Sequence, residues 1–294
     1  MTIVDAQVHV WAESTPQRPW PADAIEPQRA LPLGPEELLG HMDRAGVDRA
    51  VLIPPTWEGS RNDLALAAAQ ARPHRFAVMG RLDWAVPEQV AQVATWRDTP
   101  GMLGIRMSLN RGDVAGRLRA GYDTGFFELA EAHGVPLTVY APGRYALYER
   151  IATDFPQLRI TVDHVAVESA DRPLRAAIAG LRTLAALPNV AVKASALPCF
   201  VTEAFPYPSI SAAVGDLVGW FGPERVFFGS DLSRLPCSYE QLVEVFADRT
   251  PGLSTSERQL VLGDALIAWL GWPDPACDVA STSSATTSTS GGTS

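Results

Sequence analysis

Residues 3–10 read IVDAQVHV, and this stretch has the pattern of a β-strand. Apolar residues alternate with Asp5, Gln7 and His9, and a period of two places successive side chains on opposite faces of a strand. We therefore expect Asp5, Gln7 and His9 to share one face. If this face is directed inward, Gln7 and His9 lie together at the carboxyl end of the strand.

Seven more strand-like runs follow along the chain, and segments with helical periodicity separate them. This alternation indicates parallel strands joined by right-handed crossovers. Eight strands with eight helices can close into a barrel, whereas an open doubly wound sheet usually has about five to seven strands. We predict one domain, a (β/α)8 TIM barrel over residues 1–275. The strands are expected at 3–10, 49–53, 76–81, 102–107, 137–140, 159–163, 189–193 and 226–229, and the helices at 35–45, 64–72, 87–97, 126–133, 145–154, 173–187, 211–221 and 239–247.

The composition favours a small-molecule partner. Of the 294 residues, 47% are hydrophobic, which is enough to bury a large core, and the formal net charge is −9. Nucleic acid and anionic lipid are bound by clustered Lys and Arg, so the negative charge disfavours both. We find neither a secretory signal nor a run of about 20 apolar residues, and we expect a cytoplasmic protein. A homo-oligomer is compatible with these features.

Two long loops, the C-terminal segment and the cysteines lie outside the pattern of strands and helices, and we predict the structure of each separately. The predicted loops at 11–33 and 195–210 are unusually long and rich in proline and aromatic residues, so they are either a semi-rigid apolar lid or packed insertions. Residues 276–294 are dominated by Ser, Thr and Gly, and we expect a disordered tail. Cys199, Cys237 and Cys277 lack metal or redox spacing and are expected to be reduced, buried thiols.

Polar side chains recur at the carboxyl ends of the predicted strands, where barrel enzymes place their active sites. Branched apolar side chains fill a barrel interior, so packing alone does not account for these polar residues. By contrast, His41, His74 and His133 fall in or just after predicted helices, and we expect them to be structural. The strand-end set is Gln7, His9, Thr56, Trp57, Arg81, Asp83, Arg106, Ser108, Tyr140, Asp163, His164, Lys193, Ser195, Ser230, Asp231 and Arg234.

Several of these strand ends resemble the motifs of a known family. The chain is similar to the amidohydrolase-2 family, and especially to its dicarboxylate-lactonase-like branch, over residues 3–272. The resemblance implies a barrel of the amidohydrolase type and a hydrolytic enzyme. The segments that carry it are VDAQVHVW at 4–11, GIRMSLN at 104–110, ITVDHVAV at 160–167, NVAVKAS at 189–195, VFFGSDLSR at 226–234 and LGDALIAWLGW at 262–272.

The chain departs from the family's metal-binding pattern at the first strand. Gln7 stands where the family usually has the first histidine of His-x-His, while His9, His164 and Asp231 match. An amide oxygen is a poor zinc ligand, although three protein ligands can hold a catalytic zinc. The family's dicarboxylate lactonases are understood to work without metal, so we expect no cofactor. The alternative is one divalent ion, zinc or manganese, held by His9, His164 and Asp231.

The same resemblance assigns catalytic roles to His9, His164 and Asp231. Asp231 would take a proton from the attacking water, and the two histidines would polarise the carbonyl and stabilise the oxyanion. Alternatively, Asp231 caps the loop after the eighth strand, and each histidine is a satisfied core residue.

A second group of strand-end residues is expected to bind the substrate. Arg81, Arg106 and Arg234 follow three strands, and their planar guanidinium groups suit a carboxylate, so a small anionic substrate is expected unless each arginine pairs with an internal carboxylate. Lys193 can contact substrate, stabilise charge or join a buried ion pair. The predicted substrate-binding set is Gln7, Arg81, Arg106, Tyr140, Lys193, Arg234, Trp11 and Trp57.

Three functions remain open from the sequence. The first is hydrolysis of a small carboxylated lactone or a related ester or amide. The second is metal-dependent, non-oxidative decarboxylation of an aromatic or unsaturated acid, which other members of the wider family perform. The third is a non-catalytic barrel that binds a small molecule, or a barrel recruited as a biosynthetic cyclase or dehydratase, because fold does not determine function.

Overall fold

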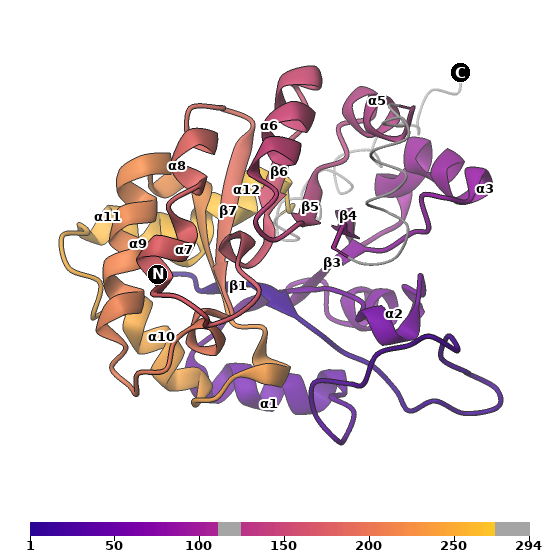
Figure 1. The fold of residues 1–294 in the computed structure, drawn as a ribbon. Coiled ribbons are helices and arrows are strands. Elements are labelled where there is room, and N and C mark those ends of the chain that lie inside the picture. The colour runs from indigo at the N-terminus through magenta and orange to yellow at the C-terminus, as the bar shows by residue number, and fades with distance from the viewer. Residues whose placement is uncertain (111–124, 274–294) are drawn as a thin grey trace, which may run out of the picture.

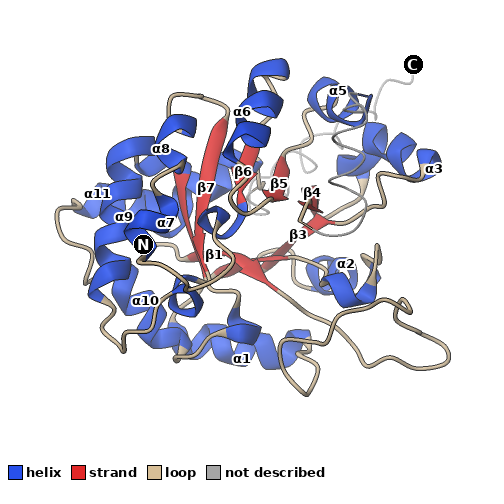
Figure 2. Ribbon diagram, viewed as in Figure 1, coloured by secondary structure: helices blue, strands red, loops and turns tan. Residues whose placement is uncertain are grey.

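The computed structural model describes residues 1–110 and 125–273. Eight strands form one sheet in the order β1 to β8, and each strand runs parallel to the next. Helices surround these strands in Figure 1, and Figure 2 shows the same two layers by secondary structure. The predicted (β/α)8 barrel is confirmed, while the predicted tail at 276–294 lies outside the described residues. The strands are β1 (Val4–Val8), β2 (Arg49–Leu52), β3 (Phe76–Gly80), β4 (Met102–Ser108), β5 (Leu137–Tyr140), β6 (Ile160–Val162), β7 (Val190–Ser195) and β8 (Val226–Gly229).

The helical layer follows the predicted alternation with two local differences, and two helices that were not predicted, α11 (Thr255–Gln259) and α12 (Ala265–Leu270), come after it. The predicted helix at 173–187 is two short helices, α7 (Leu174–Ile178) and α8 (Leu181–Leu184), and the predicted helix at 87–97 continues from α3 (Pro87–Ala91) into a 3₁₀ segment. No helix among the described residues is long and apolar enough to cross a membrane. The α-helices are α1 (Pro35–Ala45), α2 (Asp63–Ala71), α3 (Pro87–Ala91), α5 (Gly125–Ala132), α6 (Tyr145–Asp154), α7 (Leu174–Ile178), α8 (Leu181–Leu184), α9 (Pro208–Phe221), α10 (Tyr239–Ala247), α11 (Thr255–Gln259) and α12 (Ala265–Leu270).

The C-terminal helices close one end of the barrel interior. Met79, Leu103 and Phe227 belong to a buried cluster that also contains Leu266 and Trp272, at and just after α12. Side chains therefore fill this part of the interior, as expected for a barrel of eight strands. The open cavity lies at the opposite end of the barrel, at the carboxyl ends of the strands.

The first strand contains an irregularity that its sequence pattern does not reveal. The register of β1 against β2 shifts between Asp5 and Val8. The carboxylate of Asp5 accepts a hydrogen bond from Tyr239 of the outer helix α10, whereas Gln7 contacts Lys193 of β7. The expectation that Asp5 shares a face with Gln7 and His9 is therefore wrong, because a bulge inserts an extra residue and reorients the side chains that follow it.

Asp5 joins the two ends of the sheet. Its buried carboxylate accepts hydrogen bonds from the backbone N–H groups of Gln7 and Ser230, at 2.8 and 2.9 Å, and from the Tyr239 hydroxyl. The N–H of Asp231 also donates to the carbonyl oxygen of Gln7 at 2.8 Å. Although burial raises the pKa of the Asp5 carboxyl, these donors stabilise its charged form.

Replacing Asp5 by alanine should lower the free energy of unfolding by about 2–3 kcal/mol, because buried donors lose their acceptor. Urea denaturation followed by circular dichroism measures this change. The matched control is Asp154→Ala on α6, whose exposed carboxylate lies 3.6 Å from Arg150 and whose loss should cost no more than about 0.5 kcal/mol. Equal stability of the Asp5 variant and the wild type would exclude a role for Asp5 in closing the barrel.

Candidate active site

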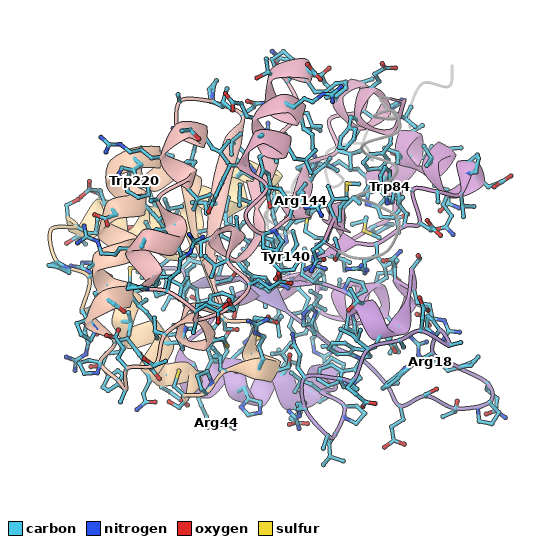
Figure 3. The ribbon with its side chains drawn as sticks, viewed as in Figure 1. Arg18, Arg44, Trp84, Tyr140, Arg144 and Trp220 are labelled. Carbon is cyan, nitrogen blue, oxygen red and sulfur yellow. The ribbon has the colours of Figure 1, made fainter. Side chains whose placement is uncertain are left out.

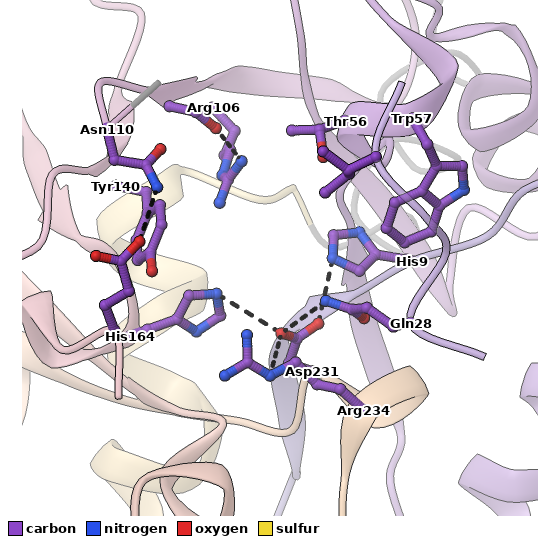
Figure 4. Close-up of a pocket in the computed structure, with 13 residues that line it drawn as sticks. His9, Gln28, Thr56, Trp57, Arg106, Asn110, Tyr140, His164, Asp231 and Arg234 are labelled. Carbon is purple, nitrogen blue, oxygen red and sulfur yellow. Dashed lines mark hydrogen bonds and ion pairs between the residues drawn. The ribbon is translucent and has the colours of Figure 1, made fainter. Parts of the chain in front are cut away.

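A cavity of about 230 Å³ opens at the carboxyl ends of the strands. Figure 4 shows it in close-up, with side chains from opposite sides of the barrel pointing into one space. In Figure 3, Tyr140 lies near the centre of the molecule, while Arg18, Arg44 and Trp220 lie toward its periphery. The cavity is lined by His9, Ile25, Gln28, Thr56, Trp57, Arg106, Ser108, Asn110, Tyr140, His164, Glu168, Asp231 and Arg234.

Asp231 lies between the two histidines of this cavity. Its Oδ1 atom is 3.2 Å from Nε2 of His9, and its Oδ2 atom is 3.7 Å from Nε2 of His164. All three side chains are buried. The structure therefore brings together residues that directly follow β1, β6 and β8.

The backbone around this group adopts strained conformations. His164 has a φ of 47° and Asp231 a φ of 54°, both in the left-handed region that non-glycine residues rarely occupy. Val165, with a φ of 49°, is a stronger outlier because its side chain is β-branched. Such conformations cost about 1–3 kcal/mol each and concentrate at functional sites, where the surrounding structure holds them.

The hydrogen bonds of His9 fix the position of its proton. Nδ1 lies 2.6 Å from the carbonyl oxygen of Ile53, and a carbonyl can only accept, so Nδ1 carries hydrogen. The neutral ring then presents a lone pair at Nε2, which lies 3.4 Å from the amide nitrogen of Gln7. Consistent with this, Oδ1 of Asp231 is buried and has no hydrogen-bond donor. His9 can donate to Asp231 only when its ring is protonated.

His164 is neutral at pH 7. Burial lowers its pKa to about 4, although the carboxylates of Asp163 and Asp231 oppose this shift. Its Nε2 lies within 3.8 Å of both carboxylates, so the ring proton is favoured there, and Nδ1 accepts from the hydroxyl of Ser195 at 2.9 Å. His164 thus offers an N–H donor at Nε2.

Asp231 is ionised at neutral pH. Burial alone would raise its pKa, but the contact with His9 and the positive charge of Arg234 outweigh burial. The pKa of this carboxyl therefore lies below its ordinary value. Gln28 also donates to Oδ2 at 3.5 Å.

A buried ion-pair network lies beside His164 and Gln7. Oδ1 of Asp163 forms an ion pair with Nζ of Lys193 at 2.8 Å, and Oδ2 accepts a hydrogen bond from Nε of Arg106 at 3.1 Å. Lys193 also donates to Oε1 of Gln7, which orients the Gln7 amide nitrogen toward His9. Of the three roles left open for Lys193, the structure shows the buried ion pair. Asp163 has a lowered pKa because its cationic neighbours outweigh the effect of burial.

The predicted substrate-binding residues fall into two groups. Trp57, Arg106, Tyr140 and Arg234 line the cavity with the three predicted catalytic residues. The other four do not line it. Gln7 and Lys193 contact each other in the barrel interior, Trp11 packs edge-to-face on Trp57 with ring centroids 5.2 Å apart, and Arg81 lines a neighbouring cavity.

The three arginines do not form one unpaired cluster. Arg106 is bound by Asp163, and Nε of Arg234 lies 3.5 Å from Oδ2 of Asp231. Among the described residues, no carboxylate forms an ion pair with Arg81, whose Nη1 atom is buried without a hydrogen-bond partner. The predicted pairing of arginines with internal carboxylates therefore applies to Arg106 and Arg234 alone.

The long loops contribute unequally to the cavity. Ile25 and Gln28, from the loop at 11–33, line it, and Phe200 approaches His164 with ring centroids 6.5 Å apart. Phe205 and Tyr207 instead line a separate cavity. An apolar lid formed by both loops is thus present only in part.

Four cavity residues were not among the strand-end candidates, namely Ile25, Gln28, Asn110 and Glu168. Each lies in a segment after a strand, and only loop length pointed to the first two. The predicted structural histidines His41, His74 and His133 lie outside the cavity. Cys199 and Cys237 are free thiols but only half-buried, because both border the separate cavity, and Cys277 lies outside the described residues.

The alternative metal site consists of His9, His164 and Asp231, all three of which line the cavity. Within residues 1–110 and 125–273, no three His, Cys, Asp or Glu side chains are placed to hold one metal ion. Gln7 adds no imidazole and directs its oxygen to Lys193. Gln7 therefore adds no ligand to the set His9, His164 and Asp231.

Comparisons with known proteins identify the family. A sequence model of the amidohydrolase family matches residues 4–271. An L-fucono-1,5-lactonase from Burkholderia ambifaria is 28% identical over 294 residues, covering 94% of this chain and 88% of the relative. A crystal structure of an amidohydrolase from Burkholderia multivorans with bound zinc superposes with a TM-score of 0.76 at 22% identity, covering 93% of this chain and 100% of the other. A putative 2-pyrone-4,6-dicarboxylic acid hydrolase from Pseudomonas putida gives a TM-score of 0.72 at 24% identity, covering 93% and 98%. The chain therefore belongs to the amidohydrolase family of enzymes.

Proposed function

We propose that this enzyme hydrolyses a small lactone that carries a carboxylate, and that it does so without a metal ion. The observation that carries the proposal is the position of Asp231, an ionised carboxylate in the cavity lining between His9 and His164. A carboxylate in this position can accept a proton from a water molecule bound in the cavity. The lactonase relative supports the choice of a cyclic ester as substrate.

The reaction begins when Asp231 accepts a proton from water and the oxygen attacks the lactone carbonyl. His164 donates from Nε2 to the oxyanion that forms, and His9, whose ring is held through Nδ1 by the carbonyl oxygen of Ile53, lies on the other side of Asp231. The ring C–O bond then breaks, and the proton held by Asp231 passes to the departing alkoxide. The product is an open-chain hydroxy acid.

The lowered pKa of Asp231 makes this carboxylate a weak base in the free enzyme. The tetrahedral intermediate carries negative charge close to it, and a neighbouring like charge raises the pKa of a carboxyl group. Asp231 therefore becomes more basic at the step in which the proton is transferred.

The arginines support an anionic substrate. Arg106 and Arg234 place two guanidinium groups in the cavity wall, and although each also pairs with an internal carboxylate, a guanidinium has five N–H donors in a planar fork that matches a carboxylate. Tyr140 contributes an aromatic face, over which the Arg106 guanidinium lies at 5.5 Å from the ring centroid.

A lactone panel tests this proposal. Purified enzyme is assayed by proton release against five- and six-membered lactones with and without a carboxylate, each before and after dialysis against a chelator. We expect turnover of carboxylated lactones that the chelator leaves unchanged. Loss of activity on dialysis, with recovery on adding zinc or manganese, would refute the metal-independent mechanism, and no turnover of any lactone would refute the function.

A further inference from the structure

A second cavity of about 200 Å³ adjoins the active-site cavity. Its lining includes Arg81, Ser60 and Asp83, and it shares Thr56, Arg106 and Ser108 with the active-site cavity. None of the three proposed catalytic residues lines it. We call this space the Arg81 cavity.

Arg81 is the cation in this region whose charge is left without a partner. Its Nη1 atom is buried and has no hydrogen-bond partner, and its Nη2 atom only reaches the hydroxyl of Ser108 at 3.5 Å. Neither of these two nitrogen atoms contacts a negatively charged group. A partly buried guanidinium without a counter-ion costs free energy that an anionic ligand would recover.

The surroundings of Arg81 add to this cost. Burial lowers its pKa to about 9, and the neighbouring positive charge of Arg106 contributes to the same shift. Arg106 is neutralised by Asp163, and it also donates to the hydroxyl of Ser108. Arg81 and Arg106 therefore both contact the hydroxyl of Ser108. Asp163 is the one carboxylate among the described residues that forms an ion pair with this pair of arginines.

Asp83 is the acidic residue in the lining of this cavity. Its side chain is exposed, and its Oδ1 atom accepts a hydrogen bond from the N–H of Ala85 at 2.9 Å. This carboxylate is therefore engaged by its own turn and does not neutralise Arg81.

We propose that the Arg81 cavity is an anion subsite that binds a carboxylate of the substrate. The proposal rests on the proposed lactone hydrolysis and specifies its substrate. The carboxylate occupies the Arg81 cavity, and the scissile carbonyl lies beside Asp231 in the adjoining cavity. The preferred lactone thus carries its carboxylate away from the carbonyl that is attacked, and Ser108, Thr56 and Arg106 lie between the two groups.

Direct binding tests the subsite independently of turnover. Isothermal titration calorimetry is performed with glutarate and citrate on the wild type, Arg81→Met, Arg81→Lys and the surface control Arg72→Met, whose side chain pairs with exposed Glu36. We expect Arg81→Met to weaken binding by roughly tenfold to a hundredfold, as for loss of a charge-assisted contact. Arg81→Lys should weaken it less, and Arg72→Met should match the wild type.

Kinetics with two lactones that differ only in a carboxylate or its methyl ester provide the second readout. Arg81→Met should lower kcat/KM for the acid at least about tenfold more than for the ester. Affinity and selectivity within twofold of the wild type, or no binding of either anion by the wild type, would overturn the subsite. If the enzyme opens no lactone, the proposed function fails, and the calorimetry still decides the subsite.

Thermal unfolding separates a binding role from a structural one. Because Arg81 has no ion pair to lose, Arg81→Met should unfold no lower than the wild type without ligand, and added citrate should raise its Tm less. Two results together would show that the guanidinium stabilises the fold and does not bind an anion. The Tm of Arg81→Met would fall as far as that of a core variant, and citrate would raise the Tm of Arg81→Lys as much as that of the wild type.

Discussion

Asp231→Asn should lower kcat at least about hundredfold for every lactone that the wild type opens, because the amide cannot accept the proton of the attacking water. The fold should persist, since asparagine has the same shape and tolerates the left-handed backbone at this position. The backbone hydrogen bond from residue 231 to Gln7 is also kept. Steady-state kinetics with proton release measures the effect.

Asp216→Asn is the matched control for this variant. Asp216 is a carboxylate on α9 that pairs with exposed Arg175, far from the cavity lining. Its kcat should equal that of the wild type. If Asp231→Asn retains full turnover while its Tm is unchanged, Asp231 has no part in the reaction.

Asp163→Asn should lower the free energy of unfolding by about 3–5 kcal/mol, because it leaves the buried cations Arg106 and Lys193 without their shared counter-charge. Urea denaturation measures this loss. Asp216→Asn again provides the control, and as a surface ion pair it should cost no more than about 1 kcal/mol. A loss below 1 kcal/mol at Asp163 would show that the network does not stabilise the barrel.

The pH dependence of the free energy of unfolding provides a second test of the role of Asp163. The pKa of Asp163 is lower in the folded state than its ordinary value of 3.8, so the unfolded chain binds this proton first as the pH falls. The stability that Asp163 contributes is complete above that ordinary value and is lost as the pH falls below it. Wild-type stability should therefore decline below about pH 4, and the decline should be shallower in Asp163→Asn.

The strand pattern predicted the barrel because eight runs of parallel-strand character leave few ways to bury their apolar faces. It failed inside β1, where the bulge between Asp5 and Val8 turns Asp5 toward Tyr239. A hydrogen bond to a helix more than 200 residues away has no local signal. The helices α11 and α12 were also missed, although the capping box at Ser254 and Glu257 marks the start of the first.

The convergence of His9, His164 and Asp231 on one cavity was predictable because strand ends meet at one end of a barrel, whatever their separation in sequence. The pairing of the arginines was not, because it depends on which carboxylate each side chain reaches. Arg106 pairs with Asp163 and Arg234 pairs with Asp231, whereas Arg81 forms no ion pair with a carboxylate among the described residues. Gln28 reaches Asp231 from a loop whose path the sequence does not specify.

A single turnover in ¹⁸O-labelled water tests the central claim most directly, namely that Asp231 activates water for attack on a lactone. With enzyme in excess over a carboxylated lactone, mass spectrometry should find one ¹⁸O atom in the new carboxylate of the product and none in the protein. Label in Asp231 after the first turnover would identify that side chain as a nucleophile, and an unopened lactone would exclude the reaction. Either result would contradict the mechanism.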